Sequence, residues 1–252
     1  DLETRLQGTP SERVTQATDT PAPQKWVHLQ KATAYADDEL NQALEQALSE
    51  NRIVLLADNT YWSMSRFQQV QAQMIAFVAD FHEHYPLKLG LSREELRSRL
   101  GIKNALLSML LEQNEYLQKQ DDIIKQQDFE IQFSEAQEIN VRAFIRQMNE
   151  TPSAPPSYKV ALEILGEDIL HALIDMREII QISPDVIFHV DAYNEMIEVV
   201  LGLIERHGEV DAKMVRDSLE TSRKYAIALL EYLDSIGLTK RVGDVRVRGK
   251  IK

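Results

Sequence analysis

The sequence predicts a mainly α-helical protein with small β hairpins, of the α+β class, in which four winged-helix domains follow one another in an extended arrangement. The first observation is a pattern that occurs four times: an amphipathic helix, a break marked by Pro or Gly, a short helix, a longer apolar helix and a strand hairpin. The second is its period, because the step from the last helix to the first strand falls at Ile53, Tyr116, Ile179 and Leu238. Three helices and a hairpin within about 60 residues are typical of a winged helix.

The period divides the chain into four predicted domains, at residues 1–65, 66–133, 134–189 and 190–252. The third helix of each domain is expected at 38–50, 102–114, 166–177 and 222–236. Two Pro-rich stretches, at 21–23 and 151–157, resemble linkers but precede the short second helix of their domains. Because Pro is compatible with a helix start, we interpret both stretches as internal to their domains.

In the second domain, apolar residues at helical spacing predict a helix over 67–81, and Ser92 is expected to begin the next helix as its cap. In the fourth domain we expect helices at 190–204, 210–219 and 222–236, then strands at 238–241 and 245–248 joined by a turn at Gly243. Residues 190–252 are expected to fold alone around a core of their own, formed by Met196, Ile197, Val200, Leu201, Ile204, Ile227, Leu230, Leu233, Ile236 and Leu238.

The net charge of -12 is unevenly distributed along the 252 residues. Residues 1–189 hold 17 basic and 29 acidic side chains, whereas residues 190–252 hold 11 of each. Within 213–252 there are ten basic and five acidic side chains, a balance of +5. An acidic chain with one basic end predicts one small nucleic-acid site, because phosphate binding requires clustered cations. The alternative is a solvated basic end with no ligand.

Several other classes of protein find no support in the sequence. The absence of Cys excludes disulfides and thiolate zinc sites, and no apolar run approaches the ~20 residues needed to span a membrane. We therefore expect a soluble cytoplasmic protein without membrane contact. The six His residues form no ligand set, and the glycines of 243–250 lack the spacing of a phosphate loop. No catalytic residue, metal or cofactor is expected in this chain.

In the fourth domain, cations are concentrated at the start of the third helix and on the wing. Arg223 and Lys224 occupy the first turn of the third helix, where Thr221 or Ser222 is the expected cap and the helix dipole favours phosphate. Strand alternation places Arg246 and Arg248 on one face, so both could approach the same backbone. Tyr225 shares a helical face with apolar residues, which favours the core over base stacking.

The stretch SLETSRKYAIALLEYLDSIGLTKRVGDVRVRG at 218–249 resembles the last winged helix of the bacterial selenocysteine-specific elongation factors, the SelB family. The stretch FHEHYPLKLGLSREELRSRL at 81–100 resembles the second winged helix of the same family. The resemblance implies a non-enzymatic, monomeric arm that binds an mRNA hairpin beside a UGA codon. The expected RNA-binding residues are Ser222, Arg223, Lys224, Lys240, Arg241, Gly243, Arg246 and Arg248.

In that family an N-terminal GTPase, absent from this sequence, would bind GTP and selenocysteinyl-tRNA, and the ribosome is a further candidate partner. Two alternatives remain, a tandem winged-helix DNA-binding or transcription-associated factor and a protein-interaction scaffold. The acidic or neutral third helices of the first three domains disfavour a DNA regulator, and the basic end disfavours a pure scaffold. The choice of RNA over DNA follows from the resemblance.

Overall fold

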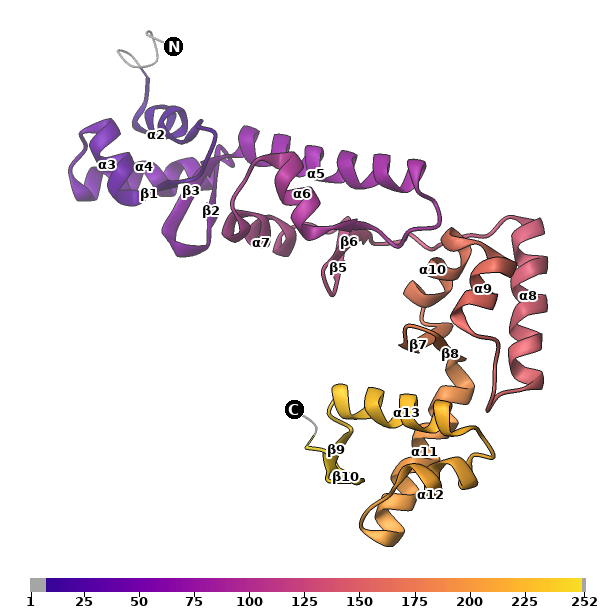
Figure 1. The fold of residues 1–252 in the computed structure, drawn as a ribbon. Coiled ribbons are helices and arrows are strands. Elements are labelled where there is room, and N and C mark those ends of the chain that lie inside the picture. The colour runs from indigo at the N-terminus through magenta and orange to yellow at the C-terminus, as the bar shows by residue number, and fades with distance from the viewer. Residues whose placement is uncertain (1–7, 251–252) are drawn as a thin grey trace. The chain divides into compact units, whose positions relative to one another are not determined.

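A computed structural model describes residues 8–250. The chain forms two compact units. The first unit comprises the chain up to residue 84 together with 90–129, and the second comprises 85–89 and the chain from residue 130 onward. Helices and small antiparallel hairpins alternate in both units (Figure 1), which confirms the predicted α+β class. No helix in residues 8–250 is long and apolar enough to cross a membrane.

The first winged helix forms a helical core closed by a three-stranded sheet. Its elements are α2 (Pro10–Thr18), β1 (Gln24–Lys25), α3 (Trp26–Thr33), α4 (Asp37–Ser49), β2 (Ile53–Leu56), η1 (Ala57–Asn59) and β3 (Thr60–Ser63). The sheet has the order β1-β3-β2, and the first strand was not expected from the sequence. A capping box at Thr9 and Glu12 begins α2, and the buried indole of Trp62 donates a hydrogen bond to the carbonyl oxygen of Thr20.

The second winged helix follows without a linker, because its long first helix begins directly after β3. Its elements are α5 (Met64–His84), β4 (Leu91–Ser92), α6 (Arg93–Leu100), α7 (Asn104–Glu112), β5 (Leu117–Gln120) and β6 (Ile123–Gln126). Ser92 caps α6 as expected, since its Oγ accepts a hydrogen bond from the backbone nitrogen of Glu95 at 3.1 Å. The sheet order is β4-β6-β5, so a short first strand is again added to the hairpin.

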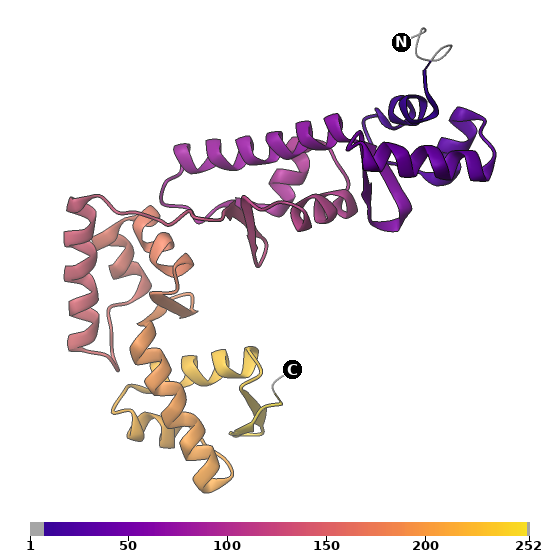
Figure 2. The same cartoon turned by 180° about the vertical axis from the view of Figure 1, so that it is seen from behind.

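The second unit contains the third and fourth winged helices. The third has α8 (Glu135–Glu150), α9 (Tyr158–Leu165), α10 (Glu167–Asp175), β7 (Ile179–Ser183) and β8 (Val186–His189). The fourth has α11 (Val190–His207), α12 (Ala212–Ser218), α13 (Arg223–Ser235), β9 (Thr239–Val242) and β10 (Val245–Arg248). The view from behind shows α11 continuing directly from the β7–β8 hairpin (Figure 2). Both Pro-rich stretches lie before a short second helix, as expected.

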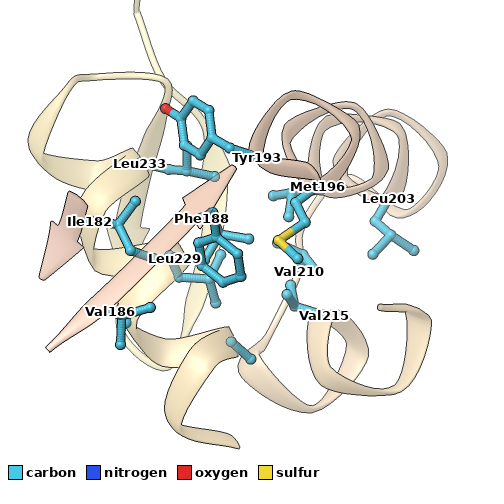
Figure 3. Packing of buried hydrophobic residues seen from close by; sticks show 14 of the residues in the cluster. Ile182, Val186, Phe188, Tyr193, Met196, Leu203, Val210, Val215, Leu229 and Leu233 are labelled. Carbon is cyan, nitrogen blue, oxygen red and sulfur yellow. The ribbon is translucent and has the colours of Figure 1, made fainter. Parts of the chain in front are cut away.

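The core of the fourth winged helix is shared with the wing of the third. Ile182, Val186 and Phe188 of the β7–β8 hairpin are buried in the same cluster as residues of α11 and α13. Figure 3 shows Phe188 amid the labelled residues of this cluster. The expectation that residues 190–252 have a complete core of their own is therefore wrong. Ile236, expected in that core, is 47% exposed.

Strand alternation explains how one hairpin serves two cores. Successive side chains of a strand point to opposite faces, so residues two apart share a face. Ile187 is buried with the third winged helix, whereas its neighbours Val186 and Phe188 are buried with the fourth. In β7, Ile179 lies in the third core and Ile182 in the fourth. Because both faces are covered, the hairpin joins the two winged helices of this unit.

We expect Phe188→Ala to destabilise the fourth winged helix, because the substitution leaves a cavity between the hairpin and α13. The expected loss of unfolding free energy is about 3–5 kcal/mol. Chemical denaturation followed by circular dichroism measures it. Ile164→Ala, at an exposed site of α9 in the same unit, is the matched control and should change stability by less than about 0.5 kcal/mol. Equal stability of the two variants would show that the fourth winged helix does not depend on the hairpin.

Candidate nucleic-acid interface

The start of α13 presents cations at a capped helix terminus. Ser222 is the N-cap, and its Oγ accepts a hydrogen bond from the backbone nitrogen of Tyr225. Arg223 and Lys224 follow in the first turn with exposed side chains. The unpaired N–H groups of this turn and the positive end of the helix dipole attract an anion. Tyr225 packs its ring edge against Phe188, which agrees with the expected place in the core.

A hollow of about 490 Å³ lies between α12, α13 and the wing formed by β9 and β10. It is lined by Asp211, Ala212, Lys213, Arg216, Arg223, Ile227, Glu231, Arg241, Asp244 and Arg246. Five of these residues are basic and three are acidic, so the lining carries a balance of +2. The structure thus brings Arg223 from the helix start and Arg241 from the wing to one concave surface. We call this surface the basic hollow.

Two lining cations of α12 were not among the expected site residues. Lys213 is exposed, whereas Arg216 is half-buried and paired with the carboxylate of Asp217. Asp211 caps the helix through the backbone nitrogen of Met214. The sequence could have indicated that these two cations belong together, because Lys213 and Arg216 are three positions apart and such residues lie on one face of a helix. That face could be assigned to the site only once the packing of α12 against α13 was known.

Most of β9 and the turn of the wing are exposed. Lys240, Arg241 and Gly243 are exposed, and the Arg241 Nε donates a hydrogen bond to the Gly243 carbonyl oxygen at 3.0 Å. Gly243 has a φ of +63°, which a residue with a side chain adopts at a steric penalty. The two-residue turn between Val242 and Val245 is the one expected from the sequence.

Arg246 does not have the exposed position that strand alternation suggested, because its face of β10 is turned toward α13. The residue is 5% exposed, and its Nε donates to the Oδ2 of Asp234 at 3.2 Å. The other oxygen of Asp234 accepts from the Thr239 hydroxyl at 2.6 Å. The backbone of Arg246 also exchanges two hydrogen bonds with the backbone of Val210, at 2.8 and 2.9 Å. Arg246 therefore attaches the wing to the helices.

The remaining two expected cations are exposed but paired. Arg248 lies on the same side of β10 as Arg246, and its Nη1 is 3.4 Å from the Oε1 of Glu205 on α11. Lys224 forms an ion pair with Asp185, which lies in the turn between β7 and β8. The hydrogen bond to Asp185 raises the pKa of the Lys224 ammonium above its ordinary value. Neither cation lines the basic hollow.

Comparison with known proteins finds similarity in two segments of the chain. Residues 202–248, which contain the basic hollow, match the family model described as elongation factor SelB, winged helix. Residues 75–128 match a second model with the same description. Both segments are similar to winged-helix domains of SelB elongation factors. The first match covers α12, α13 and the wing of the fourth winged helix, and the second covers most of the second winged helix.

One curated protein and a solved structure of selenocysteine-specific elongation factors are also similar to the chain. The chain is 27% identical over 189 residues to the selenocysteine-specific elongation factor of Desulfomicrobium baculatum, a match that covers 68% of the chain and 29% of that protein. A crystal structure of a bacterial selenocysteine-specific elongation factor shares the fold over 99% of the chain and 39% of its own length, with a TM-score of 0.50 and 16% identity.

A second similar structure is the mRNA-binding domain of E. coli SelB in complex with SECIS RNA. It is 26% identical, covers 47% of the chain and all of its own length, and has a TM-score of 0.36. The chain spans less than a third of the curated relative and less than half of the elongation-factor crystal structure.

We expect Arg246→Ala to destabilise the fourth winged helix by about 3 kcal/mol, because it removes a buried side chain and leaves the partly buried Asp234 carboxylate without its cation. Arg248→Ala is the matched control on the same strand face. Its ion pair with Glu205 is exposed on both sides, so the loss should stay below about 1 kcal/mol. Urea denaturation of both variants measures the difference. A similar small effect for both would contradict the attachment role of Arg246.

Proposed function

We propose that this chain is the RNA-binding arm of a selenocysteine-specific elongation factor, and that its fourth winged helix binds a hairpin in messenger RNA. The observation that carries the proposal is the place of the basic hollow. It lies on α12, α13 and the wing, within the residues that match the SelB winged helix. A cationic concave surface on an otherwise acidic chain suits a polyanion.

The lining suits nucleotides that are not stacked in a duplex. Arg223 can bind a phosphate with two parallel hydrogen bonds, and the N–H groups at a helix start also favour an anion. Glu231 and Asp244 only accept hydrogen bonds, so they favour N–H groups of bases over phosphate. Because the major groove of A-form RNA is too narrow for a helix, loop nucleotides are the expected ligand.

The other winged helices are proposed to act outside the RNA site. Helix α4 begins with Asp37, Asp38 and Glu39, and α10 begins with Glu167 and Asp168. These carboxylates repel phosphate at the position where α13 has Arg223. In our proposal, guanine nucleotide and selenocysteinyl-tRNA bind in other parts of the elongation factor, and the chain itself is not an enzyme.

An electrophoretic mobility comparison tests the function. The probe is an mRNA hairpin that follows a UGA codon read as selenocysteine, and the control is duplex DNA of equal length at the same ionic strength. Binding of the hairpin alone supports the proposal. Equal or preferential binding of DNA would favour a DNA-binding factor, and binding of neither would favour a scaffold.

Arg223→Ala is expected to weaken hairpin binding by about 1–3 kcal/mol, roughly fivefold to 160-fold, while leaving the fold intact. The reason is the exposed position of Arg223 at the edge of the basic hollow. Filter binding measures the dissociation constant, and circular dichroism checks the fold. Arg142→Ala removes an equally charged, exposed side chain from α8 and should leave the affinity unchanged. Equal affinities of the two variants would place the RNA elsewhere.

Hairpin binding should also weaken as salt rises, because each phosphate contact releases a condensed counterion. For single-stranded loop nucleotides the logarithm of the affinity should fall by about 0.7 per contact for each unit of log salt. Filter binding between 50 and 300 mM KCl measures the slope. Arg223→Ala should reduce the slope by about one contact, whereas a salt-independent affinity would contradict a phosphate-based site.

A further inference from the structure

The third winged helix holds the start of α13 through side-chain contacts. The Tyr225 hydroxyl donates a hydrogen bond to the Pro155 carbonyl oxygen at 2.9 Å, and the Thr221 hydroxyl donates to the carbonyl oxygen of Ser153. Both acceptors lie in the Pro-rich loop that precedes α9. Residues that flank Lys224 on either side are thus fixed to the preceding domain, so the Lys224 ammonium meets that domain in a defined place.

The carboxylate that pairs with Lys224 also belongs to a segment that is held in place. Asp185 lies in the turn between β7 and β8, and its carbonyl oxygen accepts a hydrogen bond from the backbone nitrogen of Tyr158 at 3.2 Å. The next residue, Val186, is buried in the core shared with the fourth winged helix. The contact between Asp185 and Lys224 therefore joins two anchored segments.

We propose that Asp185 is a negative determinant of RNA binding, which competes with an RNA phosphate for the Lys224 ammonium. The inference rests on the proposed function, since it assigns a ligand contact to Lys224 beside the basic hollow. In the free protein the cation of Lys224 is neutralised by Asp185. In the bound state a phosphate takes the place of the carboxylate, and the Asp185 side chain turns to solvent.

The geometry permits this exchange. The side chains of Lys224 and Asp185 are 57% and 51% exposed, so solvent screens the pair and its separation requires no movement of the backbone. Lys224 follows Arg223 in the first turn of α13, about 100° farther around the helix. A nucleotide chain that leaves the hollow past Arg223 would reach Lys224 next.

The test compares hairpin affinities of the wild-type chain, Asp185→Asn, Lys224→Ala and the double variant at about 0.1 M salt. Asp185→Asn should bind about twofold to fivefold more tightly than wild type, the factor expected when an exposed ion pair no longer competes. Its affinity should also fall more steeply with salt, because in the wild type salt also weakens the competing ion pair and so offsets part of the loss. In the Lys224→Ala background the same substitution should have almost no effect.

Glu163→Gln provides the charge-matched control, since it removes one exposed carboxylate from α9 of the same unit. It should reproduce only the long-range effect of charge on affinity. Unchanged or weaker binding by Asp185→Asn would overturn the competition, as would an equal gain in the Lys224→Ala background. Failure of the wild-type chain to bind the hairpin would instead overturn the proposed function, so the two failures are distinguishable.

Discussion

The fourth winged helix depends on the burial of the β7–β8 hairpin on both of its faces. One face completes the third core through Ile179 and Ile187, and the other places Phe188 against α13. Apolar packing therefore stabilises the same two strands on both of their faces. This packing fixes the side of α13 that meets the third winged helix, and so determines which side remains available for a ligand.

The wing depends on a second constraint, the pairing of Arg246 with Asp234. A buried cation is tolerated only with a hydrogen-bonded counter-ion, which here is the Asp234 carboxylate. The Thr239 hydroxyl donates a hydrogen bond to the same carboxylate. One of the arginines that were expected to bind RNA thereby holds the strands against α13. Arg241, which lies opposite Arg246 in the strand pairing, is left exposed to face the basic hollow.

Charge is separated along the chain in a way that matches this geometry. The carboxylates at the starts of α4 and α10 are stabilised by the helix dipole, which favours anions at that end. The same position in α13 holds two cations, which the dipole disfavours. These cations are unfavourable for the helix by itself, but they are consistent with a role in binding, because an anionic ligand at the helix start would interact favourably with both the cations and the dipole.

The sequence alone determined the order of helices and hairpins, the caps of α6 and α13 and the wing turn, because these depend on neighbouring residues. Periodicity, a cap at Thr221 or Ser222 and the turn at Gly243 are local effects, and the structure agrees with each, with Ser222 as the cap. The short strands β1 and β4 escaped detection, since two residues carry no periodic signal. Only the tertiary structure decided that Arg246 is buried, that Lys224 meets Asp185 and that Lys213 lines the site. Each depends on partners distant in sequence, which local patterns do not encode.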